Sequence, residues 1–362
     1  MLRIAFVLAF WRLAGAALLD DVLAAHPDEA GQPFVPLEDE KCAGQQPCFH
    51  TTAAERRAAG CGGKLWAGEW DKPGPMGRMA KGAPMNRFHP TAEASCDVSH
   101  SFALSSSPWA RGPSAEAAEA HALKRLEPLR GKLWFTVGTS IDHRSTMACP
   151  TMFGLERKVY AGLGDACHLP LLNATFMYAF IDGLSTREFA RSPEGQKAFL
   201  AERSQALAKH GWHGRPDMFT LSGTEWDFKH FTEAKRKPDL AGASKAVALW
   251  ITSMRSQWPR AAAVSFRTTY HADKNYGSKV NYDAYNALIH AAVSDATLPA
   301  GQCGQAAVLE MDQLMRNGGS SKTGWTDGLH PAPWVTFAYI NLGLNFMADL
   351  DFNCAPAATA RV

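Results

Sequence analysis

Short apolar runs alternate with longer helical stretches from about residue 132 to the end of the chain. Strand-like runs, rich in aromatic and β-branched residues, occur at 132–137, 175–181, 217–222, 261–267 and 306–311. Helical patterns occur at 186–210, 240–257, 281–295 and 334–349. Such alternation is typical of βαβ units, in which a helix returns the chain to the end of the sheet where the next parallel strand begins. We therefore expect an α/β fold with about five parallel strands.

The domain organisation follows from where this pattern begins. Residues 115–129 are rich in Ala, Leu and Glu and predict a helix that leads into the first strand. The chain of 362 residues is long enough for one large domain, expected at 116–354, after an N-terminal extension. Because open α/β sheets bind ligands at the carboxyl ends of their strands, we expect the site near Ser140, Gly223 and Arg267.

The first residues predict a signal peptide at 1–24. A basic start, an apolar run and a small-residue segment, Ala14-Gly15-Ala16, follow one another. Arg12 interrupts the run and Asp20 closes it, so about 20 uninterrupted apolar residues for a membrane-spanning helix are not present. An organellar transit peptide is the alternative. The expected location is the secretory pathway, either the Golgi lumen or outside the cell.

The eight cysteines favour an oxidising compartment, although reduced, buried thiols are the alternative. Residues 25–115 are loop-rich and show little hydrophobic periodicity, so disulfides would stabilise what a core cannot. Cys149 with Cys167 and Cys303 with Cys354 are candidate pairs by their proximity in sequence. Asn173 starts a glycosylation sequon, Asn-Ala-Thr. The four cysteines of the N-terminal region are Cys42, Cys48, Cys61 and Cys96.

Composition excludes several classes of function. A net charge of +2 argues against a polyanion partner, and no basic, aromatic-interleaved patch indicates nucleic-acid binding. We expect no cofactor, because no glycine-rich phosphate loop occurs, and no metal, because the histidines lack ligand spacing with cysteines. The 11 tryptophans fit either a carbohydrate cleft or an ordinary core.

The apolar run 132–137 ends in Gly138-Thr139-Ser140, a Gly-x-Ser turn that could lift a serine hydroxyl above the sheet edge. The alternative role of Ser140 is to cap the following helix. Near the far end of the chain, Asp327 precedes His330 by three residues, in a segment that also reads as a plain turn. Together these residues predict a catalytic triad with Ser140 as nucleophile, His330 as base and Asp327 as its orienting acid.

The block from Arg130-Gly-Lys through Gly138-Thr139-Ser140 to Arg144 resembles the first conserved block of the PC-esterase families in the SGNH (GDSL-like) superfamily. These families include the plant trichome-birefringence-like polysaccharide O-acetyltransferases. The segment from Asp327 to His330 resembles the superfamily's C-terminal Asp-x-x-His. The resemblance spans the plan of roughly residues 120–350. It implies a flavodoxin-like three-layer α/β/α fold and O-acyl ester chemistry, with the three triad residues carrying over by position.

Two departures from the family pattern concern the environment of the nucleophile. The family's Gly-Asp-Ser has Thr139 in place of its acid, so hydrogen bonding in the turn must differ. The superfamily's Gly-x-Asn block, which supplies an oxyanion donor, is replaced by Gly223-Thr224-Glu225, and an ionised Glu225 cannot donate a hydrogen bond. The expected donors are therefore the backbone amides of Ser140 and Gly183, helped by Ser222, Thr224 or the Gly223 amide.

Three residues are candidates for substrate binding: Arg144, Trp226 and Arg267. Trp226-Asp227 partly matches a pair in PC-esterase-like proteins, the alternative being an aromatic core residue with a capping acid. Arg267 would bind a substrate carboxylate or pin the catalytic loop, or else form a structural pair with an acid such as Asp227.

The sequence thus predicts an esterase or O-acetyltransferase that acts on acyl esters of a carbohydrate through an acyl-enzyme. Its partners would be a glycan and an acyl donor. The alternative is a catalytically inactive, glycan-binding lumenal protein that retains the fold.

Overall fold

The computed structural model describes residues 68–70, 88–90, 126–153, 156–169, 172–271, 279–296, 298–299, 301–317, 330–331 and 333–356. The expected signal peptide at 1–24 lies outside these residues. So do most of the 25–115 region with its four cysteines, most of the helix expected at 115–129, the side chain of Cys149, and Asp327.

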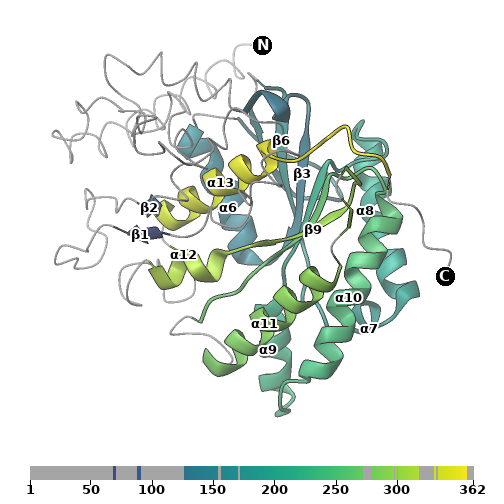
Figure 1. Cartoon of the computed structure of the whole chain (residues 1–362), viewed down its shortest axis with the longest axis vertical. Helices are drawn as coiled ribbons and strands as arrows, with labels where there is room; N and C mark the ends of the chain where they lie inside the picture. Colours follow the sequence, from purple (N-terminus) through teal and green to yellow (C-terminus); the bar gives the residue numbers. More distant parts are fainter. Residues whose placement is uncertain are drawn as a thin grey trace, which may run out of the picture.

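The chain folds into an α/β structure built on a mixed, mostly parallel sheet of seven strands (Figure 1). In spatial order they are β4 (Glu156–Val159), β5 (Asp165–Leu169), β6 (Ala174–Phe180), β3 (Leu133–Gly138), β7 (Met218–Leu221), β8 (Ala263–Arg267) and β9 (Gln305–Leu309). The strands β6, β3, β7, β8 and β9 are parallel, whereas β4 and β5 pair antiparallel at one edge.

All five strands expected from the sequence are present, each within about two residues of its expected bounds. The hairpin of β4 and β5 was not expected, because Glu156-Arg-Lys-Val159 has neither an apolar run nor alternation. It covers the edge of β6 that would otherwise be open.

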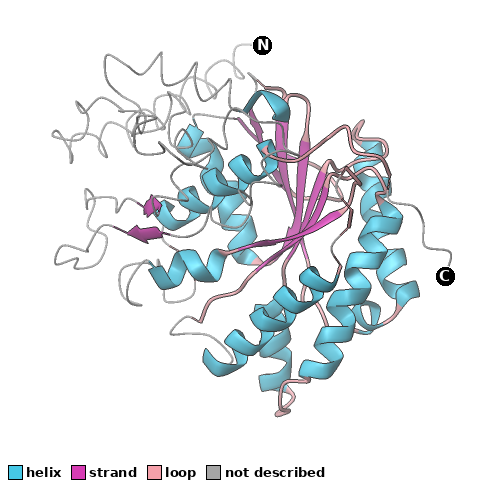
Figure 2. Ribbon diagram, viewed as in Figure 1, coloured by secondary structure: helices cyan, strands magenta, loops and turns pink. Residues whose placement is uncertain are grey.

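Helices cover both faces of the sheet (Figure 2). On one face lie α6 (Ser140–Phe153), α12 (Met311–Asn317) and α13 (Pro333–Ala348). On the other lie α7 (Glu188–Arg191), α8 (Pro193–Lys209), α9 (Thr224–Glu233), α10 (Leu240–Gln257) and α11 (Lys279–Asp295). The four expected helical stretches are confirmed as α7 with α8, α10, α11 and α13, whereas α9 and α12 were not expected.

The central strand β3 is buried along its whole length, as expected for a strand covered by helices on both faces. Its side chains alternate between two cores. Trp134 packs with Tyr339 of α13, while Phe135 packs with Phe219 of β7 and Trp258 after α10. Gly343 of α13 faces Trp134 so closely that a Cβ there would lie 2.6 Å from an atom of the indole ring. The contacts of Trp134 hold α13 against one side of β3.

A disulfide joins Cys303 to Cys354, which confirms one of the two expected pairs. Cys167 of β5 is also disulfide-bonded, and its pairing with Cys149 stays a prediction. The sequon residue Asn173 is exposed in the turn before β6, with φ of 49°.

In the N-terminal region the structure describes a small antiparallel sheet of β1 (Gly68–Trp70) and β2 (Phe88–Pro90). Strand β1 lies against α12 (Figure 1), so this part of the expected irregular region contacts the main sheet domain. Of the predicted helix before β3, the described part is a short 3-10 turn, Glu127–Leu129.

Candidate active site

The site is built where β3 ends and α6 begins. The residue that caps α6 is Thr139: its carbonyl accepts the first helical bond from His143, and its hydroxyl accepts the Ile141 amide at 3.3 Å. Asp142 accepts the Thr139 amide in return at 2.9 Å, which completes a capping box of the form Thr-x-x-Asp. Ser140 is therefore the first residue of the helix, and its expected alternative role as the cap belongs to Thr139.

Gly138 is required because Asp142 folds back over it. A Cβ on Gly138 would collide with the Asp142 carboxylate and would lie 2.6 Å from Ser222 Oγ. The glycine therefore provides the close approach of backbone and carboxylate that the capping box needs.

The structure brings together Ser140 and His330, which the sequence predicted as nucleophile and base. His330 Nε2 lies 2.8 Å from Ser140 Oγ, a hydrogen-bond distance. Ser140 is exposed, and its position in the first turn of α6 places its oxygen near the positive end of the helix dipole. The third expected member, Asp327, lies outside the described residues.

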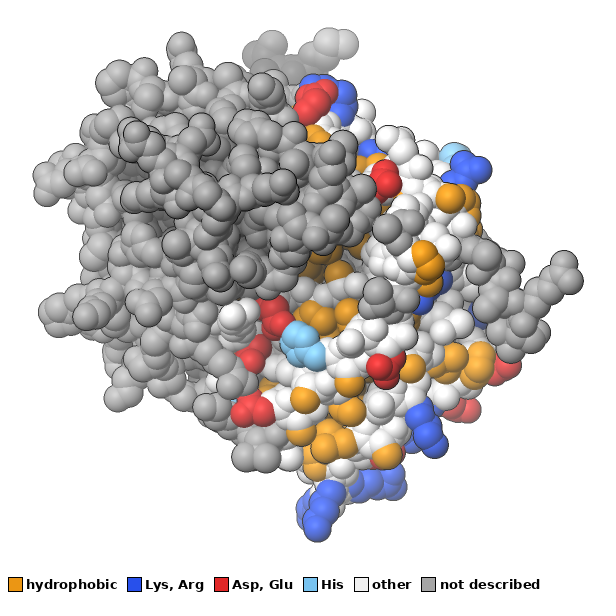
Figure 3. Space-filling view, viewed as in Figure 1, with side chains coloured by type: hydrophobic (Ala, Val, Ile, Leu, Met, Phe, Trp, Pro, Cys, Tyr) orange, Lys and Arg blue, Asp and Glu red, His pale blue; other side chains and the backbone are white. Residues whose placement is uncertain are grey.

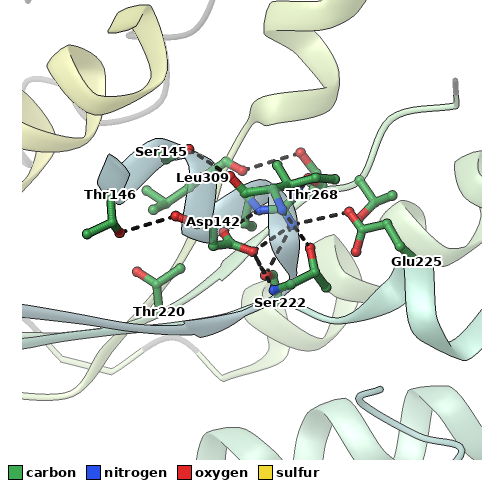
Figure 4. A network of polar contacts seen from close by, with 12 residues as sticks. Asp142, Ser145, Thr146, Thr220, Ser222, Glu225, Thr268 and Leu309 are labelled. Carbon is green, nitrogen blue, oxygen red and sulfur yellow. Dashed lines mark hydrogen bonds and ion pairs between the residues drawn. The ribbon is translucent and has the colours of Figure 1, made fainter. Parts of the chain in front are cut away.

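A buried polar cluster lies beneath this turn, formed by Asp142, Arg267, Glu225 and Ser222; Figure 4 labels Asp142, Ser222 and Glu225. Arg267 donates to Asp142 through Nε, 2.7 Å from Oδ1, and through Nη2, 3.0 Å from Oδ2. The same Nη2 lies 3.1 Å from Ser222 Oγ and 3.1 Å from Glu225 Oε1. Burial alone would lower the pKa of Arg267, but the charges of Asp142 and Glu225 raise that pKa well above its usual value.

Arg267 has no solvent-accessible surface, so its guanidinium faces acids instead of an open cleft. Of the roles expected for it, a structural pair with an acid describes these contacts. The acid is not Asp227, however. Asp142 and Glu225 take that place because β8 pairs with β7, which in turn pairs with β3, an order that the linear sequence does not reveal.

Asp227 instead organises the loop after β6. Its carboxylate accepts the amides of Leu184, Ser185 and Thr186 at 3.0–3.1 Å and the Tyr285 hydroxyl at 2.6 Å. This loop carries Gly183, with φ of 122°. Asp227 therefore holds a loop and is not the helix-capping acid offered as the alternative, since neither α7 nor α9 has a side-chain cap.

Two of the expected oxyanion residues are neighbours in space. A Cβ on Gly223 would lie 3.3 Å from the carbonyl carbon of Gly183, so the turns after β6 and β7 meet. Thr224 follows at the start of α9. Gly183, Gly223 and Thr224 are all buried, whereas Ser140 is exposed.

An aromatic pair borders the same edge of the sheet. The rings of Phe180 and Trp226 meet edge to face with centroids 5.5 Å apart, and Lys229 lies over the Trp226 ring at 4.0 Å. Phe180 is 46% exposed, a high value for a large apolar side chain. It pairs in register with Gly138, and by alternation from Phe176 it lies on the face covered by α6.

Sequence reasoning missed Phe180 and Asp142. The Thr-x-x-Asp spacing at 139–142 was the available signal for Asp142, whereas Phe180 reads as one more core residue of its strand. Arg144, the third candidate for substrate binding, lies in the second turn of α6 and is partly buried.

The face shown in Figure 3 carries acidic, basic and apolar side chains intermixed over its described part. Within the residues that the structure describes, no cluster of three His, Cys, Asp or Glu side chains could hold a metal ion. None of the described helices combines the length and apolar character needed to cross a membrane.

No known protein-family model matches the chain, and no curated protein sequence is significantly similar to it.

Proposed function

We propose that the chain is a serine-dependent carbohydrate O-acyl esterase or O-acetyltransferase of the SGNH type. The observation that carries the proposal is the 2.8 Å distance between Ser140 Oγ and His330 Nε2 at the carboxyl end of the central strand. The fold we propose is flavodoxin-like. Its support is the order of the parallel strands β6, β3, β7, β8 and β9, which is 2-1-3-4-5 when they are numbered along the chain.

In the proposed reaction, Ser140 Oγ attacks the acyl carbon while His330 Nε2 takes the hydroxyl proton. The tetrahedral intermediate collapses as the ester C–O bond breaks, and His330 returns the proton to the leaving sugar oxygen. A water or a second sugar hydroxyl then attacks the acyl-enzyme, gives its proton to His330, and releases Ser140. Water as acceptor makes the protein an esterase, and a sugar hydroxyl makes it a transferase.

Three features support this chemistry. Ser140 is exposed, so an ester can approach it. The first turn of α6 offers a positive dipole end to the oxyanion. The exposed ring of Phe180 beside Trp226 offers an apolar surface for the carbon-bound face of a sugar ring.

The second candidate is a catalytically inactive glycan-binding protein of the same fold, placed like the first in the secretory pathway. The burial of Gly223 and Thr224 favours it, because oxyanion donors have to reach the substrate.

A labelling experiment separates the two. The purified protein would be incubated with a fluorophosphonate probe and, separately, with an O-acetylated glycan whose acetate release is measured. Ser140→Ala is the matched control. Labelling and acetate release that both vanish in Ser140→Ala support the enzyme, whereas glycan binding without either reaction supports the binding protein.

A further inference from the structure

Asp142 uses both carboxylate oxygens to connect the ends of three strands. At the end of β3 it accepts the Thr139 amide at 2.9 Å, and at the end of β7 it accepts the Ser222 hydroxyl at 2.5 Å. At the end of β8 it receives two hydrogen bonds from Arg267. Figure 4 shows the Asp142 and Ser222 side chains pointing toward one another. One carboxylate thereby sets the relative position of three neighbouring strand ends.

The cost of this arrangement indicates that it does more than fill the core. The side chains of Arg267 and Asp142 are 0% and 1% exposed, so both charges have lost their hydration. Glu225 adds a second buried carboxylate, whose Oε2 has no hydrogen-bond partner within the described part of the chain. Well-packed apolar residues often replace buried ion pairs without loss of stability. What they cannot replace is the directional two-point contact between a guanidinium and a carboxylate.

The hydrogen bonds of this capping box also restrict the backbone on both sides of Ser140. Its two neighbours are both fixed by the capping box, Thr139 through its amide and Ile141 through its own amide. Ser140 has no freedom to rotate its backbone without breaking one of these bonds. The 2.8 Å approach of its hydroxyl to His330 therefore depends on where Asp142 is held.

We propose that Asp142, clamped by Arg267, is the positioning residue for Ser140. Its carboxylate reaches back from the third helical position and accepts the Thr139 amide, which stabilises the turn that carries Ser140. The inference rests on the proposed function, in which Ser140 is the nucleophile. It assigns to Arg267 a role in catalytic geometry exerted through Asp142, without contact to substrate.

The test compares Asp142→Asn with a matched control, Asp217→Asn. Asp217 lies just before β7, at the opposite end of the sheet, and makes the same kinds of contact. It accepts the Leu133 amide at 2.8 Å and a hydrogen bond from Arg215 at 3.1 Å. Each variant is titrated with a fluorophosphonate to count reactive serines. Then kcat and KM per titrated site are measured on an activated aryl acetate, and unfolding is followed in urea.

The expected result for Asp142→Asn is a loss of about 100-fold in kcat per titrated site with KM nearly unchanged, since small misplacements of a nucleophile have effects of this order. Asp217→Asn should lose stability while its kcat per titrated site stays at the wild-type level. Arg267→Lys keeps the charge but not the two-point contact, so it should lower kcat in the same way. It also serves as the second variant if Asp142→Asn does not fold.

Unchanged kcat per titrated site in Asp142→Asn or Arg267→Lys, with only the urea curve shifted, overturns the inference while leaving the proposed function intact. An equal loss of kcat in Asp217→Asn overturns it as well, because the effect would then be general. A wild-type protein that neither labels nor releases acetate removes the proposed function and this inference with it.

Discussion

His330 lies within hydrogen-bond distance of Ser140, 2.8 Å from Nε2 to Oγ, although 190 positions of sequence separate them. The approach follows from packing: α6 begins at Ser140, α13 begins three residues after His330, and the two helices pack against each other on one face of the sheet. The ring of Trp134 in β3 also packs against the ring of Tyr339 in α13. The two ends of the sheet domain are thus held together at Ser140.

Replacement of His330 by Ala should abolish activity as completely as Ser140→Ala does. Since nucleophile and base act as one unit, each single variant should lose about 10³-fold or more in kcat, and the double variant should lose no more than either. Steady-state acetate release checks this. Losses that multiply in the double variant would show that the two side chains act independently.

The fold was largely predictable because parallel strands buried on both faces are continuous apolar runs, as in Phe135 and its neighbours. The β4–β5 hairpin was not, because an edge hairpin with one polar strand carries no such pattern. The approach of His330 to Ser140 was predictable from their two motifs. The pairing of Arg267 with Asp142 instead of Asp227 depends on which strand ends are neighbours. It was not predictable, because local sequence patterns do not determine strand order.

Phe180 and Trp226 should contribute to substrate binding and not to the chemical step. Phe180→Ala removes a large exposed ring that is level with Gly138, so KM for an acetylated glycan should rise several-fold while kcat stays near the wild-type value. KM for a small aryl acetate should not change. The matched control is Val159→Ala in β4, an exposed apolar residue on the edge strand two strands from β6, which should leave both constants unchanged.

Asp227→Ala should destabilise the protein by at least about 3 kcal/mol, because three backbone amides, two of them fully buried, lose their acceptor and two hydroxyls lose one of their partners. Tyr285→Phe removes one of these bonds and leaves the others, so its cost should be about 1.5 to 3 kcal/mol. Urea unfolding measures both. Equal costs for the two variants would show that the loop carrying Gly183 does not depend on the Asp227 carboxylate.

The pair of His290 and Glu310 should make stability depend on pH. His290 Nε2 lies 2.8 Å from Glu310 Oε1, and this hydrogen bond raises the pKa of His290 above its ordinary value. A raised pKa in the folded state means that the pair stabilises fully below the pKa of the unfolded state, about 6.5. The contribution is lost as pH rises through the folded-state pKa. The difference in unfolding free energy between wild type and His290→Gln should therefore shrink from about pH 5 to about pH 8.

His230 should show the opposite dependence. Burial, and then the charge of Arg187, lower the pKa of His230, whose Nδ1 lies 2.7 Å from Thr186 Oγ1. A lowered pKa means that its contribution is present above about 6.5 and is lost as pH falls through the folded-state value. Urea unfolding of His230→Gln over the same pH range checks this. Parallel profiles for the two variants would contradict one of the two assignments.

The disulfide between Cys303 and Cys354 should stabilise the carboxyl-terminal half without being needed for its local geometry. The two cysteines are separated by 51 positions, a segment that includes β9, α12, α13 and His330. A closed loop of that length restricts the unfolded chain by an amount worth about 4 kcal/mol. The backbone hydrogen bonds from Cys303 to Ala355 and from Ala355 to Gly301 remain when the disulfide is absent.

The double variant Cys303→Ser, Cys354→Ser should therefore keep its kcat at low temperature while its Tm falls by roughly 10 °C. Loss of kcat in a variant that is still folded would show that the disulfide also holds His330 against Ser140.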